Sequence, residues 1–211
     1  MIGATVILAV AVLWQWGGGS DGGDGEAAAY RRIKKLANND AQDALVAEVS
    51  AKDVKAACRA VRAMARVGPK AIGGIRVAMK DTRPEVRQVA MIAVSQAGGE
   101  AETPVLSTVV MKDKSPAVRA AAALTLGRMR AYREVETLIK ALEDDDANVR
   151  RRANAAVVEI IGASVSFDAL APPAKRQRDI AALRALWSTM KPRTEYFYES
   201  RKKHKQKAGA D

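Results

Sequence analysis

The side chains that most often carry out chemistry are scarce in this chain. Its only histidine, His204, lies in a run of lysines, so a metal site built from several histidines is absent and a Ser-His-Asp triad is not expected. Its only cysteine, Cys58, falls in a column of alanines in the repeat described below, which indicates a buried, unreactive thiol. We therefore expect no catalytic residue, no metal and no cofactor, and predict that the protein is not an enzyme.

The composition points to close-packed helices with a basic surface. Aromatic residues make up 4% of the 211 positions and alanine is abundant, which suits helices better than a sheet. The net charge is +11 and the pI is about 9.9, which favours acidic partners such as nucleic acid, anionic lipid or an acidic protein. A solvated basic surface without a partner explains the same charge, and both readings stay open.

The elements that would position any site come from a repeat of about 32 residues. Its most regular mark is a valine followed by a basic residue. The four valines are Val54, Val86, Val118 and Val149. Arginine follows the last three of them, as Arg87, Arg119 and Arg150. A fixed period of this size is typical of stacked-repeat proteins.

Each unit reads as two helices joined by a short turn. Apolar residues recur at helical spacing in both halves, as in residues 118–126 and 135–142. Pro84 and Pro116 suit the first position of a helix, where their missing N–H has no cost. One such hairpin cannot bury its apolar faces alone, so stacked hairpins are expected to share a continuous core.

The repeats resemble the HEAT-like repeat family, in the bacterial form also named after phycobilisome lyases. The resemblance is carried by Asp81-x-x-Pro84-x-Val86-Arg87 and by residues 114–127, and it covers about 51–162. It implies an all-α fold, a right-handed α-solenoid of stacked antiparallel helix pairs. It also implies that each aligned arginine pairs with an acid in the turn before its helix, with Asp81, Asp113 and Asp145 available. The family does not fix a function.

In such proteins the second helices of the units line the concave face, so their outward positions are candidates for partner contact. Methionine, which adapts to varied contact surfaces, occurs there twice beside lysine. Contact with the neighbouring repeat would explain the same pattern. The candidate partner-binding residues are Ile72, Arg76, Met79, Lys80, Thr108, Met111, Lys112 and Lys140.

The first 16 residues form an uncharged apolar run that ends in two tryptophans, Trp14 and Trp16. We predict an N-terminal membrane-anchor helix, with a cleaved signal peptide and export to the periplasm as the alternative. Four basic residues between 31 and 35 favour a cytoplasmic repeat domain. Residues 17–25 then form a glycine-rich linker.

The repeat domain is predicted over 26–191. Residues 26–50 read as an N-terminal cap hairpin, and the repeats follow at 51–81, 82–113, 114–145 and 146–191, the last with a C-terminal cap. In that cap a Pro-Pro loop precedes a helix over 174–190, whose buried face would include Trp187.

Residues 192–211 are predicted to form a disordered basic tail. It would contact an anionic membrane or nucleic acid, or simply remain solvated. The residues concerned are Arg201, Lys202, Lys203, Lys205 and Lys207.

Taken together, these patterns predict a monomeric, non-enzymatic, membrane-tethered scaffold that binds an unknown protein partner on its concave face. The alternative is a nucleic-acid-binding helical-repeat protein that uses its basic surface and tail. Lyase or hydroxylase activity, which only the family name suggests, is the least favoured function.

Overall fold

The computed structural model describes residues 22–39, 41–162 and 166–208, and this part of the chain is helical with no strand. Short 3-10 turns at 69–71, 100–102 and 132–134 lead into the second helices, and another at 141–143 extends α9. The helices are α2 (Gly22–Asn38), α3 (Gln42–Val49), α4 (Val54–Val67), α5 (Ile72–Ala78), α6 (Pro84–Ala97), α7 (Thr103–Lys112), α8 (Pro116–Arg128), α9 (Val135–Lys140), α10 (Ala147–Ile161) and α11 (Pro173–Ala208).

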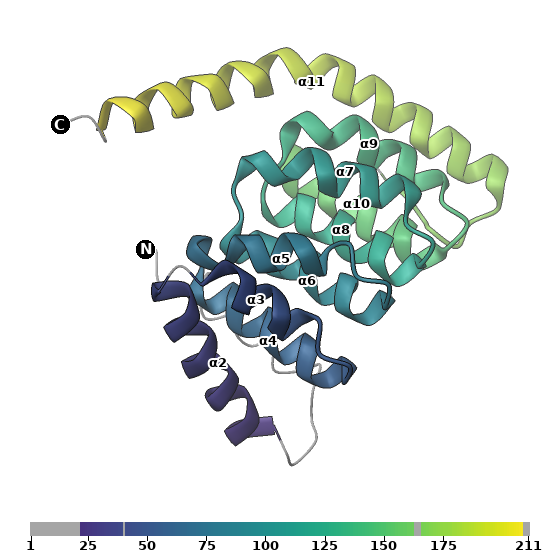
Figure 1. The fold of residues 1–211 in the computed structure, drawn as a ribbon. Helices are drawn as coiled ribbons and strands as arrows, with labels where there is room; N and C mark the ends of the chain where they lie inside the picture. Colours follow the sequence, from purple (N-terminus) through teal and green to yellow (C-terminus); the bar gives the residue numbers. More distant parts are fainter. Residues whose placement is uncertain (1–21, 40, 163–165, 209–211) are drawn as a thin grey trace.

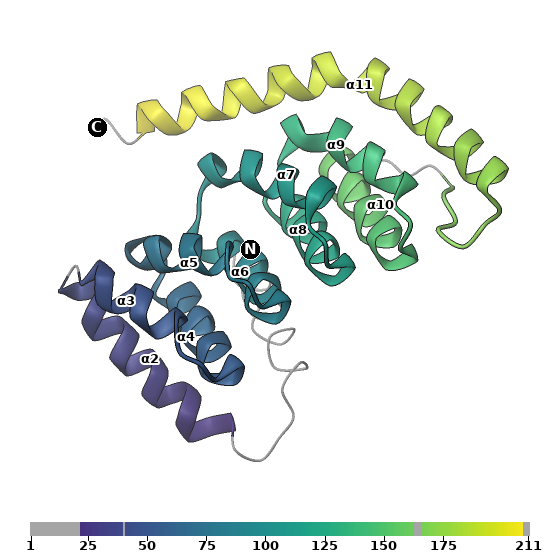
Figure 2. The same ribbon diagram turned by 45° about the vertical axis from the view of Figure 1, so that its right-hand side comes forward.

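These helices form a stack of antiparallel pairs, and the predicted all-helical repeat fold is confirmed. The first helices α2, α4, α6, α8 and α10 pack side by side in one layer, while α3, α5, α7 and α9 form a second layer (Figures 1 and 2). The predicted apolar helix over 1–16 lies outside the described residues. The helix α2 begins at Gly22, within the segment predicted as linker.

The core lies between the two layers and is built from the apolar columns of the repeat. In the second helices, Ile75, Leu106 and Leu138 are completely buried. In the first helices, the valines at 86, 118 and 149 are completely buried and the small side chains lie between neighbouring helices. Thr125 on α8 is also buried, and its hydroxyl donates to the backbone oxygen of Met91 on α6 at 2.9 Å. This bond satisfies a polar group that would otherwise be costly to bury.

A ladder of arginines ties successive units together. Arg87 donates to the backbone oxygens of Asp81 and Thr82 and, at 2.8 and 2.9 Å, to the carboxylate of Asp113 in the turn that leads into the following unit. Arg119 donates to the backbone oxygen of Asp113 and to the carboxylate of Asp144. The carboxylate thus comes from the turn after the helix pair, whereas the sequence predicted an acid in the turn before it.

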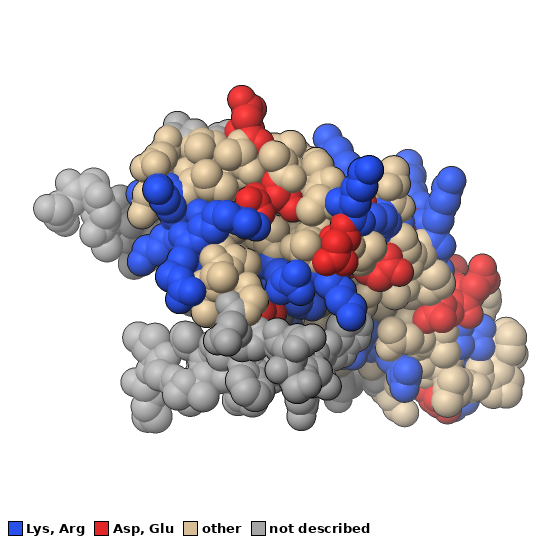
Figure 3. Space-filling view, turned by 60° about the horizontal axis from the view of Figure 1, so that its bottom comes forward, with Lys and Arg blue, Asp and Glu red and all other residues tan. Residues whose placement is uncertain are grey.

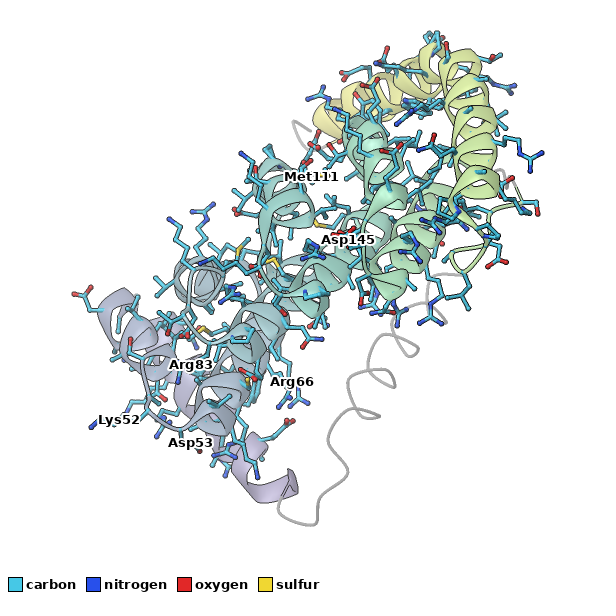
Figure 4. The ribbon with its side chains drawn as sticks, turned by 90° about the vertical axis from the view of Figure 1, so that its right-hand side faces the viewer. Lys52, Asp53, Arg66, Arg83, Met111 and Asp145 are labelled. Atoms are coloured by element: carbon cyan, nitrogen blue, oxygen red, sulfur yellow. The ribbon has the colours of Figure 1, made fainter. Side chains whose placement is uncertain are left out.

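In the first unit, the turn before the first helix is also bound by a guanidinium, but the arginine comes from the second unit. Lys55 stands where Arg87 would align. Arg83 donates instead to the backbone oxygens of Val49 and Ala51 and, at 2.6 and 2.8 Å, to the carboxylate of Asp81. Figure 4 labels Arg83 among the helices of the N-terminal part of the stack. Two carbonyls and one carboxylate are therefore bound by a guanidinium here as well.

At the other end, the last arginine of the ladder fixes the chain after α10. Arg150 is buried and donates to the backbone oxygens of Asp144 and Asp145. In place of a carboxylate it binds the backbone oxygen of Ala169, at 2.8 Å from its Nε. This contact brings the segment before α11 back to the beginning of α10.

Candidate protein-binding face

The helix α11 lies across the second layer and runs antiparallel to α9 (Figures 1 and 2). Arg184 of α11 pairs with Glu143 at 3.1 Å, and Lys191, further along α11, pairs with Glu136 at 2.7 Å. Residue numbers therefore increase along α11 in the direction in which they decrease along α9 and the turn after it. This direction follows from the return of the chain to the start of α10 before α11 begins.

The helix also extends further than predicted. It continues through Pro192 to Ala208, over a stretch that the sequence analysis treated as a disordered tail. Proline inside a helix removes one hydrogen bond and favours a bend, and α11 is arched over α9 in Figure 2. The five basic residues between 201 and 207 lie in this last part of α11, and their side chains lie outside what the structure describes.

The second half of α11 is held on the third unit by aromatic and ionic contacts. The rings of Tyr132 and Tyr198 lie 4.2 Å apart between centroids. Arg133 donates to the carboxylate of Glu199 at 2.9 Å and to the Tyr132 hydroxyl at 2.9 Å. Burial, with the nearby carboxylate of Glu100, raises the pKa of Tyr198 to about 12. A cavity of about 240 Å³ borders this contact.

A larger cavity, of about 420 Å³, lies between α9 and α11. Its lining combines apolar side chains with charges of both signs. The lining residues are Glu136, Ile139, Lys140, Arg184, Trp187, Ser188, Lys191, Pro192 and Glu195. The hydrogen bond and the charge of Lys191 hold the pKa of Glu136 below its usual value, and Glu136 raises the pKa of Lys191 in return. We refer to this space as the α9–α11 cavity.

The predicted partner-contact residues are scattered over the second layer. Arg76 pairs with Glu102, donating from its Nε at 3.0 Å. Ile72 is partly buried against the core, and the exposed Thr108 donates to the backbone oxygen of Pro104. Lys80 and Lys112 are exposed. Lys140 is exposed too, and it alone of the eight lines the α9–α11 cavity.

The two methionines that align in the repeat have different surroundings. Met79 is buried in the core cluster, whereas Met111 is 46% exposed and projects from α7 (Figure 4). The helix α5 ends at Ala78, so Met79 sits in the following turn, while α7 continues through Met111 to Lys112. Residues at the same position of the repeat therefore differ in solvent exposure.

Most of the lining of the α9–α11 cavity was not found from the sequence. The sequence placed Trp187 on the buried face of its helix, and that side chain is buried. Trp187 lies near Glu136 because α11 packs on α9, where Lys191 donates to Glu136. These two residues are 55 positions apart in the sequence, so no local pattern predicts their contact. The i, i+4 spacing of Trp187 and Lys191 was the available signal, since it places both on one face of a helix.

The structure shows the surroundings of the side chains that could bind a metal ion, act as a nucleophile or contact nucleic acid or lipid. No group of three or more His, Cys, Asp or Glu side chains in the described part of the chain could hold a metal ion. Cys58 is buried, and burial raises the pKa of its thiol. On the face drawn in Figure 3, basic side chains are interspersed with acidic ones, and neither the structure nor the comparisons below support nucleic acid or lipid as a partner.

The predicted membrane localisation is corrected. Among residues 22–39, 41–162 and 166–208, no helix is long and apolar enough to cross a bilayer. The apolar stretch over 1–16, on which the prediction rested, lies outside the described residues. The single-pass anchor is therefore not supported.

Comparison with known proteins shows what the chain is similar to. Residues 103–190 match the family model for HEAT repeats, which confirms the resemblance seen in the sequence. The fold is also similar to a solved structure, the complex of CpcE and CpcF of phycocyanin lyase from Nostoc sp. PCC7120, with a TM-score of 0.52 and 21% identity. That likeness covers 67% of this chain and 89% of the other. No curated protein matches the chain.

These findings overturn the predicted function. The sequence analysis predicted a non-enzymatic, membrane-tethered scaffold and ranked lyase-type function last. A solved structure with a similar fold is a lyase complex, and the described residues contain no membrane-spanning helix.

Proposed function

We propose that this chain is a HEAT-repeat subunit of a lyase-like protein complex, and that it binds a second protein subunit along the face formed by α9 and α11. The fold that it shares with a two-protein lyase complex supports an assembly of this kind. At 21% identity the likeness itself concerns the fold alone, so the binding face is argued from the geometry of this chain.

The observation that carries the proposal is the α9–α11 cavity. Concave sites with an apolar floor and a few polar groups are typical places for a partner to bind. Here Ile139, Trp187 and Pro192 supply apolar surface, and charged side chains lie among them. The ion pairs of Arg184 with Glu143 and of Lys191 with Glu136 hold α11 in place, so the cavity is formed before a partner arrives.

The ion pairs and aromatic contacts that fix α11 on the third unit give the chain a preformed surface for a partner. We propose that the chain holds and orients its partner within the complex. The right-handed curvature expected of such repeats would set the concave surface on which the partner lies.

Site-specific photo-cross-linking tests the proposal. A benzophenone amino acid replaces Lys140 in the α9–α11 cavity, and in a matched variant it replaces Ala155, an exposed position on α10 in the first layer. We expect one protein to be cross-linked in the source organism from position 140, and much less from position 155. Equal cross-linking from both positions, or none from position 140, would contradict the proposal.

A further inference from the structure

The last part of α11 carries two of the most exposed large apolar side chains of the described chain. Tyr196 is 70% exposed and Phe197 is 53% exposed. Their ring centroids lie 5.8 Å apart in an edge-to-face arrangement. The guanidinium of Arg193 lies over the Phe197 ring, 5.5 Å from its centroid. Large apolar side chains that lie together on a surface often mark a site of protein contact. We refer to Arg193, Tyr196 and Phe197 as the α11 aromatic cluster.

The α11 aromatic cluster faces away from the repeats. Tyr198 and Glu199 contact the third unit, and Glu195 lines the α9–α11 cavity, so these three residues mark the inner side of the helix. With 3.6 residues per turn, the three positions of the cluster fall on the opposite side. Figures 1 and 2 show no described helix on that outer side of α11. The cluster is therefore accessible to a partner.

The charge on the outer side of α11 is positive. Arg193 is exposed and forms no ion pair with the described residues, while the ion pairs of this part of α11 involve Lys191 and Glu199. The two glutamates there, Glu195 and Glu199, lie on the inner side. The sequence then continues over 201–207 with five basic residues and no acidic one. Aromatic rings beside positive charge are complementary to an acidic surface that also offers apolar side chains.

The position of Arg193 favours a protein over other acidic partners. A nucleic-acid base would have to compete with the guanidinium for the Phe197 ring. Insertion of that ring into a bilayer would carry the guanidinium toward the hydrocarbon, which is costly. In protein interfaces, by contrast, tyrosine and arginine are enriched among the residues that contribute most to the binding free energy.

We propose that the α11 aromatic cluster is a docking surface for an acidic segment of the partner protein. A carboxylate of that segment pairs with Arg193, and apolar side chains beside it cover the rings of Tyr196 and Phe197. This inference rests on the proposed function in one respect, namely that the partner is a protein subunit. It adds a second contact, on the outer side of α11, and gives the chemistry that the partner presents there.

The test uses the full chain and a pair of peptide probes. The protein is labelled with 4-fluorophenylalanine, which gives one ¹⁹F signal for each of its two phenylalanines, and the Phe197→Leu variant identifies the signal of Phe197. The probe is acetyl-Glu-Leu-Glu-Glu-Leu-Glu-Glu-Leu-Glu-amide, and the same peptide with glutamine in place of glutamate is the uncharged control. We expect a saturable shift of the Phe197 signal with the acidic peptide only, at a Kd on the order of 0.1–1 mM, while the Phe167 signal stays in place.

Two substitutions separate this surface from a general attraction to a basic protein. Arg193→Gln should weaken binding of the acidic peptide about five- to tenfold, the scale of one charge-assisted hydrogen bond. Arg178→Gln, at an exposed arginine earlier in α11, should leave the Kd unchanged. No saturable shift, equal shifts with both peptides, or equal effects of the two substitutions would overturn the inference.

Vesicles of phosphatidylglycerol and a single-stranded DNA oligonucleotide test the other acidic partners. If either one changes the Phe197 signal as much as the acidic peptide does, at an equal concentration of negative charge, the inference is overturned. Because these titrations need no partner, their failure beside successful cross-linking from position 140 rejects the acidic contact and leaves the proposed binding face standing. Binding of the peptide beside failed cross-linking rejects the proposed function alone.

Discussion

The guanidinium of Arg83 reaches back 32 residues, one full repeat, to bind the backbone oxygen of Ala51 at 2.6 Å. The aligned arginines at 87, 119 and 150 bind the turns before their own helices, so Arg83 occupies the turn site that Lys55 leaves without an arginine. Each unit boundary in the described chain is therefore closed by a guanidinium, although the sequence shows only three aligned arginines.

Removal of Arg83 is expected to destabilise the fold strongly. Arg83→Ala would leave two backbone oxygens without their donor and would remove the guanidinium from the largely buried carboxylate of Asp81. We expect a loss of about 2–4 kcal/mol in the free energy of unfolding, measured by urea denaturation. Arg59→Ala, which breaks an ion pair with exposed Asp53 at 3.8 Å, should cost about 0–1 kcal/mol. Equal losses in the two variants would contradict this role for Arg83.

A rescue experiment tests the idea that the two positions share one site. In the Arg83→Ala background, Lys55→Arg restores the arginine that the repeat pattern has at this position. We expect the double variant to recover part of the lost stability. If Lys55→Arg has the same effect with and without Arg83, the two residues do not compete for one site.

The stability of the ladder should fall in acid. Burial alone would raise the pKa of Asp113, but hydrogen bonds from Arg87 and from the backbone N–H of Ser115 outweigh it and hold the pKa below its usual value of 3.8. A folded-state pKa below the unfolded one stabilises the fold above the unfolded value and loses that contribution as the pH falls through the folded value. We expect the free energy of unfolding to decline below about pH 4 and less steeply in Asp113→Asn. Identical pH profiles for the two proteins would exclude this contribution.

Gly127 should tolerate no side chain, even though it lies within a helix. A Cβ at this position would stand 2.8 Å from the Cα of Ala156 on α10, so the two first helices would have to move apart. We expect Gly127→Ala to cost about 1–3 kcal/mol through overpacking. Gly99→Ala has open space around it and should change stability by less than about 0.5 kcal/mol. A stabilised Gly127→Ala protein would show that α8 and α10 are not in such close contact.

The core of the second layer gives a matched pair of truncations. Leu138 on α9 is completely buried, so Leu138→Ala should cost about 2–5 kcal/mol. Val105 on α7 is 44% exposed, and Val105→Ala should cost less than about 0.5 kcal/mol. Similar costs for the two substitutions would mean that the faces of the second helices are assigned wrongly.

The repeat fold could be predicted because its signals are local and periodic. The spacing of Val86 and Val118 marks the first helices, and the apolar columns through Leu106 and Leu138 mark the buried face of the second ones. Each of these side chains meets the same kind of neighbour in every unit, so the pattern carries the structural information.

The arrangement of α11 could not be predicted in the same way. The period breaks after α10, and the direction of α11 is set by single contacts such as Arg150 with Ala169 and Lys191 with Glu136. For the same reason the candidate site was largely missed: Lys140 was selected, but its neighbours across the α9–α11 cavity come from a helix outside the repeat.

Hydrogen exchange in the presence of the partner tests the central claim most directly. With the protein captured by cross-linking added in excess, exchange is compared between the free and the bound chain. If the partner lies on the face formed by α9 and α11, backbone amides over 135–143 and 184–195 should exchange more slowly in the complex, and those of α4 and α6 should be unaffected. Slower exchange confined to the first helices, or no change over 135–143 and 184–195, would contradict the account.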